Sequence, residues 1–265
     1  MKPQPKVIVV MPAYNAARTL RMTYEGLPKD RIDSIILVDD GSTDDTIAIA
    51  RRLNLEVFVH TRNFGYGANQ KTCYREALKA GADIVAMVHP DYQYDPTLLP
   101  DIIQPIIDGT ADIVLGSRLK KGSALEQGMP WWKYISNRFL TELENLCFGL
   151  RHSEYHTGYR AFHRSALEAV NFGMNSDGFV FDQEILAQAV ACELRISEIA
   201  VPVRYFKEAS SASFLQSSVY GLRILWLLAK YMAHKTGLHC SRQFQSLDRR
   251  YHPATDQAAK AHGGV

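Results

Sequence analysis

Two adjacent carboxylates end an apolar stretch of the sequence. Asp39 and Asp40 close the run Ser34–Asp40 (SIILVDD). A carboxylate at the end of a buried strand is costly unless a donor hydrogen-bonds to it. A nucleobase NH or a ribose hydroxyl would supply that bond, as it does for the acidic residues of dinucleotide-binding folds. A purely structural role remains the alternative, because Ser42 or Thr43 can cap the helix that follows.

A second group of polar side chains follows another apolar run. His89, Asp91 and Gln93 alternate along the chain, and in an extended segment alternate side chains point the same way. One imidazole, one carboxylate and one amide oxygen could hold Mg²⁺ or Mn²⁺, with nucleotide phosphates completing the coordination shell. The structural alternative is a capped turn into the helix expected from Pro96.

Paired glycines open a helix after a third apolar run. Gly65 and Gly67 lie in the segment RNFGYGAN, and such glycines let backbone NH groups approach a phosphate closely. No third glycine completes a dinucleotide fingerprint, and the glycines follow the wrong strand for a nicotinamide cofactor. A tight turn into a helix would explain the glycines but not Arg62.

The elements that must position these residues alternate regularly in the first half. Continuously apolar runs predict strands buried on both faces, over Lys6–Met11, Ser34–Asp39, Glu56–His60, Asp83–Val88 and Asp112–Ser117. Helical patterns lie between them, over Arg18–Gly26, Thr43–Leu53, Gly67–Ala80 and Pro96–Asp108. The alternation predicts an α/β fold with a Rossmann-like, mostly parallel sheet. Ligands bind beyond the carboxyl ends of such strands, which is where Pro12, Tyr14 and Asn15 follow the first run.

The second half is less regular. Helices are expected over Trp131–Phe148, Asp182–Ala191 and Ser213–His234, and strands over Tyr159–His163, Arg195–Ile199 and Val203–Phe206. No linker separates two units, so we expect a single domain over residues 1–238 and a flexible tail over residues 239–265. Charged residues interrupt the last apolar helix, which is therefore not expected to span a membrane.

Composition narrows the class of protein. The 265 residues are 46% hydrophobic and 22% charged, which excludes a disordered chain. The 30 Lys and Arg nearly balance the 28 Asp and Glu, so nothing indicates a nucleic-acid partner. Four singly scattered cysteines and a polar N-terminus predict a cytoplasmic protein without a signal peptide or a structural metal.

Taken in order, these segments resemble the family-2 glycosyltransferases of the GT-A fold. The motifs are PAYN (12–15), DDGSTDDT (39–46), RNFGYGAN (62–69), HPDYQYDP (89–96), GSR (116–118), TGYRAF (157–162), GFVFDQEI (178–185) and RYFKEASS (204–211). The pattern is most similar to the catalytic domains of dolichyl- or polyprenyl-phosphate sugar synthases, over roughly residues 7–238.

The resemblance implies inverting transfer of a sugar from a nucleoside-diphosphate sugar to a polyprenyl phosphate or a glycan hydroxyl, in cell-envelope or glycan biosynthesis. It also implies a nucleotide-sugar site, made of Pro12, Tyr14, Asn15, Asp39, Asp40, Gly65, Gly67, Asp91 and Arg204. In the family an Asp-x-Asp motif binds a divalent cation on the diphosphate. Here His89 replaces the first Asp. We therefore expect weakened or altered binding of Mg²⁺ or Mn²⁺ by His89, Asp91 and Gln93.

The acceptor decides which residues the chemical step needs. For a hydroxyl acceptor the resemblance points to Asp182 as the base, with Glu184 as the alternative. Arg118 and Arg204 would stabilise the leaving diphosphate. A phosphate acceptor needs no base, and its phosphate would then be held by Arg118, Lys133, Arg138 and Arg160.

Two alternatives stay open. His89 and the absence of the family's Glu-Asp pair would also suit a catalytically weak sugar-nucleotide-binding protein. The last helix is expected to pack on the sheet. Otherwise it is an interfacial helix that brings a lipid-linked acceptor to the site, with the protein peripheral on the cytoplasmic membrane face.

Overall fold

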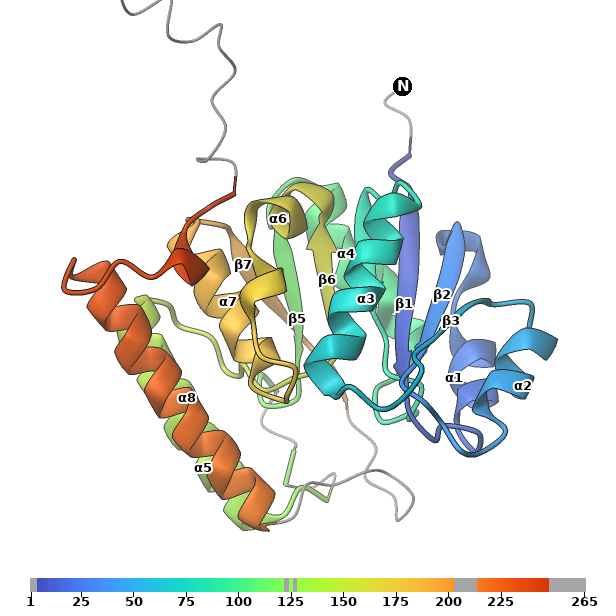
Figure 1. Cartoon of the computed structure of the whole chain (residues 1–265), viewed down its shortest axis with the longest axis horizontal. Helices are drawn as coiled ribbons and strands as arrows, with labels where there is room; N and C mark the ends of the chain where they lie inside the picture. Colours follow the sequence, from blue (N-terminus) through green and yellow to red (C-terminus); the bar gives the residue numbers. More distant parts are fainter. Residues whose placement is uncertain (1–3, 122–123, 126–127, 203–213, 248–265) are drawn as a thin grey trace, which may run out of the picture.

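The fold is a seven-stranded sheet with helices on both faces (Figure 1). The computed structural model describes residues 4–121, 124–125, 128–202 and 214–247. The strands are β1 (Val7–Ala13), β2 (Ser34–Asp39), β3 (Glu56–Val59), β4 (Ile84–Met87), β5 (Ile113–Ser117), β6 (Arg160–His163) and β7 (Ile196–Ala200). Their order is β3-β2-β1-β4-β6-β5-β7, and β6 alone runs antiparallel to its neighbours among these strands. The predicted α/β class and mostly parallel sheet are confirmed.

Helices cover the sheet because its strands are apolar on both faces. The helices are α1 (Leu20–Gly26), α2 (Thr46–Arg52), α3 (Tyr66–Lys79), α4 (Leu99–Ile107), α5 (Trp131–Phe148), α6 (Arg164–Ala169), α7 (Phe181–Ala191) and α8 (Phe214–Lys235). Ile8 and Val10 of β1 share one core with α3, α6 and α7. Val7 and Val9 share the other core with α1, α2 and α4.

The sheet register brings the ends of several strands to one edge. Ala13 of β1 pairs with Asp39 of β2, so the segments after both strands start side by side. Arg160 begins β6 opposite Met87 of β4 and Leu115 of β5, near the carboxyl ends of those strands. The antiparallel strand therefore contributes its first residue to the edge where ligands bind in such sheets.

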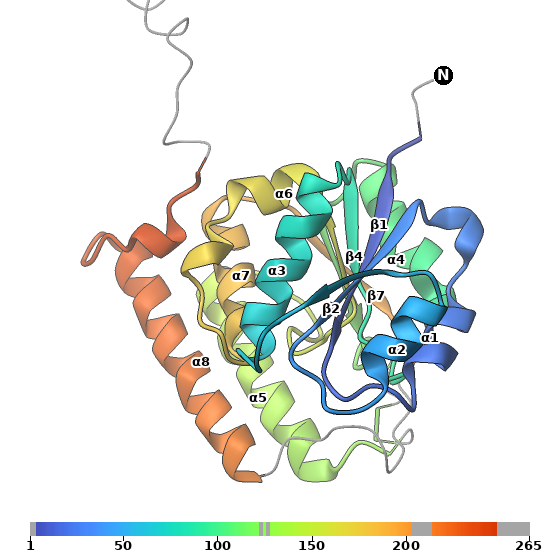
Figure 2. The ribbon, with the colours of Figure 1, turned by 45° about the vertical axis from the view of Figure 1, so that its right-hand side comes forward.

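Helix α8 lies one layer further out than expected. It packs on α5 and α7 rather than on the sheet, and Figures 1 and 2 show α5 and α8 side by side beyond α7. None of the helices in the described residues has the length and apolar character that crossing a bilayer requires.

The C-terminal segment differs from the expected flexible tail as far as residue 247. The one-turn 3-10 helix Arg242–Phe244 packs on α7 and α8, with Phe244 buried against Tyr231. The Gln243 side chain accepts a hydrogen bond from Lys230 at 2.6 Å. A single turn has no helical periodicity in sequence, which is why the pattern missed it. The rest of the tail, from residue 248, and the expected strand Val203–Phe206 lie outside the described residues.

Candidate functional site

A cavity of about 640 Å³ opens at the carboxyl ends of β1, β2 and β4. Eight residues predicted for the nucleotide-sugar and metal sites line it, namely Pro12, Tyr14, Asn15, Asp40, Gly65, His89, Asp91 and Gln93. They come from four separate segments of the sequence. The sheet topology thus brings most of the residues predicted for the nucleotide-sugar and metal sites to one cavity.

Asn15 and Tyr14 follow β1 and have different roles. Asn15, at φ 51°, donates its backbone NH to the Ser42 hydroxyl at 2.8 Å and accepts the Thr43 NH on its side-chain oxygen at 2.9 Å. These bonds tie the end of β1 to the loop after β2. Tyr14 is 52% exposed at the cavity, so its ring has a face to offer to a ligand.

The two adjacent carboxylates have different partners. Asp40 accepts the backbone NH groups of Phe64 and Gly65, both at 2.9 Å, and its Oδ1 lies 2.7 Å from His60 Nδ1. Asp39 is fully buried. Its Oδ2 accepts the Ser42 NH, whereas its Oδ1 has no hydrogen-bond partner within the described part of the chain. Asp39 is therefore the carboxylate with an oxygen still able to accept a hydrogen bond from a base or a ribose, although Asp40 is the one that lines the cavity.

The glycines of the 62–69 segment admit protein backbone rather than phosphate. A Cβ at Gly65, where φ is +106°, would lie 2.6 Å from the carbonyl oxygen of Asp177. A Cβ at Gly67 would press on the Ser176 carbonyl and lie 2.8 Å from the Phe181 Cβ. The Gly67 NH donates to the Asp177 carbonyl at 2.7 Å. The expected phosphate contact at Gly67 is thus replaced by a close contact with the segment before α7.

The segment after β4 is a turn, the alternative to the extended conformation in which the three side chains would alternate. Tyr92 has φ 58°, and the Asp91 carboxylate accepts the Gln93 NH at 3.0 Å. His89, Asp91 and Gln93 nevertheless all line the cavity. Burial raises the pKa of Asp91 and lowers the pKa of His89. Within the described ranges, no group of three or more His, Cys, Asp or Glu residues is arranged to hold a metal ion.

Asp182 lies behind the cavity wall, in the first turn of α7. Its Oδ1 accepts the Gln70 amide at 2.9 Å and pairs with the Arg160 guanidinium at 3.0 Å. Its Oδ2 accepts the Tyr66 hydroxyl at 2.8 Å. Tyr66 itself lines the cavity. Burial, and next to it the charge of Asp182, raises the pKa of Tyr66 well above its usual value, which keeps the phenol protonated.

Arg160 is a buried partner of Asp182 and does not line the cavity. Its side chain is 1% exposed and also donates to the carbonyls of Thr157, at 2.6 Å, and Tyr155, at 3.3 Å. A guanidinium enclosed in this way has no direction left for a substrate phosphate. In this arrangement Arg160 holds Asp182 and does not reach the cavity wall, so its phosphate role stays a prediction.

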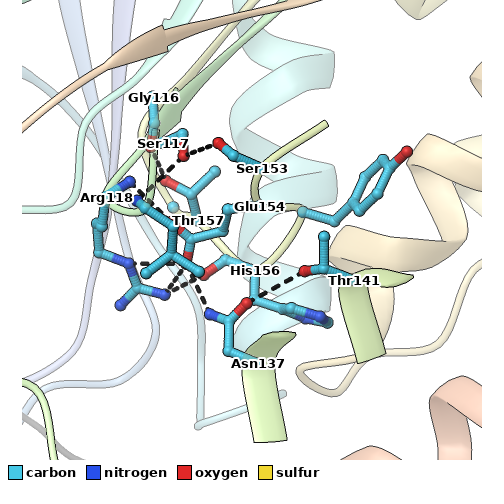
Figure 3. Close-up of polar contacts among 12 residues, drawn as sticks. Gly116, Ser117, Arg118, Asn137, Thr141, Ser153, Glu154, His156 and Thr157 are labelled. Carbon is cyan, nitrogen blue, oxygen red and sulfur yellow. Dashed lines mark hydrogen bonds and ion pairs between the residues drawn. The ribbon is translucent and has the colours of Figure 1, made fainter. Parts of the chain in front are cut away.

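Arg118 is engaged by a buried carboxylate as well (Figure 3). Its backbone NH and its Nε donate to Glu154 at 2.7 and 2.9 Å, and its terminal NH₂ bonds both Glu154 and the His156 carbonyl. Glu154 is fully buried and also accepts the Asn137 amide at 2.7 Å. Arg118 is absent from the cavity wall, in contrast to its expected place at the diphosphate.

The other predicted candidates are dispersed. Arg138 pairs with Glu142 along α5 and borders a separate, open hollow of about 770 Å³. Glu184, the alternative base, accepts the Ser176 NH at 2.7 Å and does not line the cavity. Burial, and then the charge of Arg118, lowers the pKa of Lys133. Arg204 lies outside the described residues.

Three of the cavity residues that sequence reasoning missed surround or support His89. Tyr66 stacks on His89 with ring centroids 5.5 Å apart, and Phe179 packs against Tyr66 at 4.9 Å. Gly158 makes room for the imidazole, because a Cβ there would lie 2.6 Å from the His89 Cδ2. The available signal was an aromatic residue between two glycines for Tyr66, and an aromatic beside Gly178 for Phe179.

Known proteins resemble the chain in both sequence and fold. Residues 8–170 match the family described as Glycosyl transferase family 2. The UDP-N-acetylglucosamine–dolichyl-phosphate N-acetylglucosaminyltransferase of Methanococcus voltae is 29% identical over 216 residues, covering 75% of this chain and 86% of that protein. The polyprenol monophosphomannose synthase of Mycolicibacterium smegmatis is 24% identical over 229 residues, covering 82% and 84% of the two chains.

A solved structure supports the fold. Glucosyl-3-phosphoglycerate synthase from Mycobacterium tuberculosis superposes with a TM-score of 0.68 at 19% identity, covering 86% of this chain and 80% of that one. A crystal of that enzyme contains Mn²⁺ and UDP. The chain described here belongs to glycosyl transferase family 2 and is a nucleotide-sugar-dependent glycosyltransferase with the GT-A fold.

Proposed function

We propose that this enzyme transfers a sugar, with inversion, from a nucleoside-diphosphate sugar in the 640 Å³ cavity to a polyprenyl phosphate. The observation that carries the choice of acceptor is the state of Asp182. Both of its oxygens are engaged, by Gln70, Arg160 and Tyr66. A hydroxyl acceptor needs a base within reach, whereas a phosphate acceptor is already ionised. The names of the two relatives support the same acceptor class.

The donor binds along the cavity wall in this proposal. Tyr14 stacks on the base, and Asp39 or Asp40 accepts a hydrogen bond from the base or the ribose. One carboxylate, one amide and one imidazole, from Asp91, Gln93 and His89, fit a loosely held divalent cation whose other ligands are phosphate oxygens. When bound, that cation neutralises charge on the departing diphosphate.

The reaction is a single displacement at the anomeric carbon. A phosphate oxygen of the acceptor forms the new bond to that carbon, and the bond to the donor diphosphate breaks on the opposite face. The nucleoside diphosphate leaves with the electron pair. Attack from the opposite face inverts the anomeric configuration, and no proton has to be removed from the acceptor. This is why an enzyme with a fully engaged Asp182 suits a phosphate acceptor.

The outer helix pair supports a lipid-linked acceptor. Trp131, Ile135 and Phe139 are exposed on α5 at four-residue spacing, so they share one helix face. Leu222 and Trp226 are exposed on α8 with the same spacing. Such apolar faces partition into the headgroup region of a bilayer. We infer a peripheral protein whose α5 and α8 contact the cytoplasmic membrane face.

The first test of the donor site is thermal unfolding with UDP, GDP, dTDP or CDP, each with Mn²⁺ or Mg²⁺. A nucleotide at 100 times its dissociation constant stabilises the protein by about 2.7 kcal/mol. We expect a metal-dependent shift with one nucleotide, and Asp91→Ala should abolish the metal dependence. The absence of a shift with every pair contradicts the donor site. Donor binding without any turnover would favour a sugar-nucleotide-binding protein.

The test of the acceptor is Asp182→Asn, assayed with the donor that binds and a polyprenyl phosphate. A general base contributes about 10²–10⁴-fold to rate. A loss of rate on that scale, accompanied by loss of the acidic limb of the pH profile, contradicts a phosphate acceptor. We expect the acidic limb of the profile to be unchanged. A loss of rate alone does not identify a base, because Asp182 also accepts from Tyr66 and pairs with the buried Arg160. Asp177→Asn, at an exposed carboxylate paired with Lys71, is the matched control.

A further inference from the structure

Tyr66 connects the cavity to the buried carboxylate of Asp182 through one hydroxyl group. The phenol oxygen lies 2.8 Å from Asp182 Oδ2 and 3.2 Å from His89 Nε2. A phenol has one proton to donate, and its oxygen can also accept a hydrogen bond. The direction of that proton therefore decides whether His89 Nε2 donates a hydrogen bond to Tyr66 or accepts one.

The surroundings of Asp182 settle the direction. The Tyr74 hydroxyl donates to Gln70 Oε1 at 3.1 Å, which orients the Gln70 amide nitrogen toward Asp182. The Arg160 guanidinium can only donate, and it supplies the charge that matches a carboxylate. Asp182 thus accepts from all of its side-chain partners, so the Tyr66 proton points at Asp182 and not at His89.

The imidazole of His89 then has to donate through Nε2. A neutral imidazole carries one N–H, so the other nitrogen, Nδ1, keeps its lone pair. Nδ1 has no hydrogen-bond partner in the portion of the chain described by the structure. The position is built for this ring, because it stacks on Tyr66 within 9° of parallel and Gly158 leaves the space beside Nε2.

We propose that Tyr66 is a positioning residue that fixes His89 as the Nε2–H tautomer, so that Nδ1 offers a lone pair to the divalent cation of the donor cavity. The inference rests on the proposed donor site, because it assigns the cation that Asp91 and Gln93 would share. His89 then keeps the metal-ligating capacity of the aspartate it replaces, without the negative charge. The opposite tautomer would place an N–H on Nδ1, which could only donate to a diphosphate oxygen.

The tautomer can be measured without metal, nucleotide or turnover. Nitrogen-15 NMR of the histidine-labelled full-length protein distinguishes a protonated ring nitrogen from one with a lone pair. We expect His89, assigned by comparison with His89→Gln, to show N–H at Nε2 and a lone pair at Nδ1. Tyr66→Phe keeps the ring and removes the hydroxyl, and should abolish this preference. Tyr155→Phe removes a buried hydroxyl that donates to Asn145, outside this network, and should retain the preference.

Metal binding is the second measurement, made with Mn²⁺ alone and with Mn²⁺ plus UDP. Loss of a partner that orients a metal-ligating histidine typically costs about 10–100-fold in metal affinity. We expect that loss in Tyr66→Phe but not in Tyr155→Phe, together with broadening of the His89 signals by Mn²⁺ in the wild-type protein. An Nδ1–H tautomer in the wild-type protein overturns the proposal. Equal Mn²⁺ affinity in the wild type and Tyr66→Phe, or no Mn²⁺ binding by the wild type, overturns the ligand assignment. UDP stabilisation without Mn²⁺ leaves the donor site intact in either case, so the two failures are distinguishable.

Discussion

Two regions of the molecule use their polar residues differently. One is built on β1, β2 and β4 around the cavity, and the other on β5, β6, α5, α7 and α8. We call them the donor side and the acceptor side, after the proposed function. On the donor side, the segments after three parallel strands line one cavity, with Tyr14 and Asp91 on its wall. On the acceptor side, Arg118 and Arg160 are held by the buried carboxylates Glu154 and Asp182. The donor side presents its polar groups to a cavity, whereas those of the acceptor side pair with each other inside the protein.

The difference has a physical cause. Parallel strands deliver the residues that follow them to one edge of the sheet, whatever their side chains are. The antiparallel strand β6 and the loop before it bring opposite charges together inside the protein, where an unpaired charge is costly. The charged residues of the acceptor side therefore form ion pairs with each other. They influence a substrate only through neighbours such as Tyr66, which contacts both Asp182 and the cavity.

The largest expected effect comes from removing the buried cation. In Arg160→Met the carboxylate of Asp182 stays buried without its charged partner, which typically costs about 3–5 kcal/mol. We expect a loss of that size in the free energy of unfolding, measured with urea at pH 7. The double variant Arg160→Met with Asp182→Asn should recover part of the loss, because no net charge remains to be buried.

A solvent-exposed arginine provides the matched control. Arg195 pairs with Asp112 at 2.7 Å, and its side chain is 55% exposed. Exposed ion pairs contribute about 0–1 kcal/mol, so Arg195→Met should cost far less than Arg160→Met. Equal losses in the two variants would show that Arg160 is not structurally different from a surface arginine, and the contrast between the two sides would fail.

Gly67→Ala tests the contact that joins the two sides. The added methyl would press on the Ser176 carbonyl and on Phe181, so the segment before α7 must move. Overpacking of this kind costs about 1–3 kcal/mol. Urea unfolding should show this loss, and donor binding should weaken because Phe179 lines the cavity.

Gly81→Ala is the control for Gly67→Ala. Gly81 has φ +80°, and no atom lies within 4 Å of the position that an added methyl would take, so the substitution adds only backbone strain. Donor affinity should stay at the wild-type value in Gly81→Ala. If Gly67→Ala also binds donor normally, the segment before α7 does not shape the cavity.

Glu154→Gln weakens the ion pair that keeps Arg118 out of the cavity. The amide NH₂ of Gln replaces one carboxylate oxygen that accepts from Arg118 or Asn137, so a buried donor loses its acceptor. We therefore expect a loss of about 1–3 kcal/mol in unfolding free energy. Glu142→Gln, in the exposed pair with Arg138, is the control and should change stability by about 0.3–0.5 kcal/mol. Indistinguishable effects would mean that burial of Glu154 adds nothing to the pair.

The contrast also explains what the sequence could predict. The strand Ser34–Asp39 and the helix Trp131–Phe148 were predicted with their observed bounds, because hydrophobic periodicity is a local property. The partner of Arg118 lies 36 residues further along the chain, and no local pattern indicates which carboxylate a cation will meet. The sequence likewise left an extended segment and a turn open after β4, and the left-handed Tyr92 belongs to the turn.

The same limit applies within the donor site. Asp39 and Asp40 were both predicted from their place after a buried strand, and both are buried there. Which of the two keeps an unmet hydrogen bond depends on the backbone NH groups of the 64–65 loop, which satisfy Asp40. That detail belongs to the tertiary structure, so it could not be read from the spacing of residues alone.

The smallest effect on stability should come from the outermost residues of the acceptor side. Trp131 and Trp226 are 70% and 73% exposed, so replacing both by Ser should change the unfolding free energy by no more than about 0.5 kcal/mol per site. Their transfer into a bilayer interface removes apolar area from water, about 1.5–3 kcal/mol for a large side chain buried fully. We expect the double variant to lose at least about tenfold in binding to anionic vesicles, measured by flotation.

The control separates a membrane-contacting face from general stickiness. Helix α1 lies at the opposite end of the molecule from α5 and α8 (Figure 1). Its Met22 is 43% exposed, and Met22→Ser should float like the wild type. Wild-type protein that remains entirely unbound contradicts membrane contact through these helices. Reduced flotation in the Trp double variant with undiminished turnover on a short, water-soluble polyprenyl phosphate would assign the two tryptophans to delivery of the lipid and not to the chemical step. Reduced turnover on that short acceptor would instead place the two tryptophans at the acceptor site itself. Then α5 and α8 would bind the acceptor as well as contact the membrane.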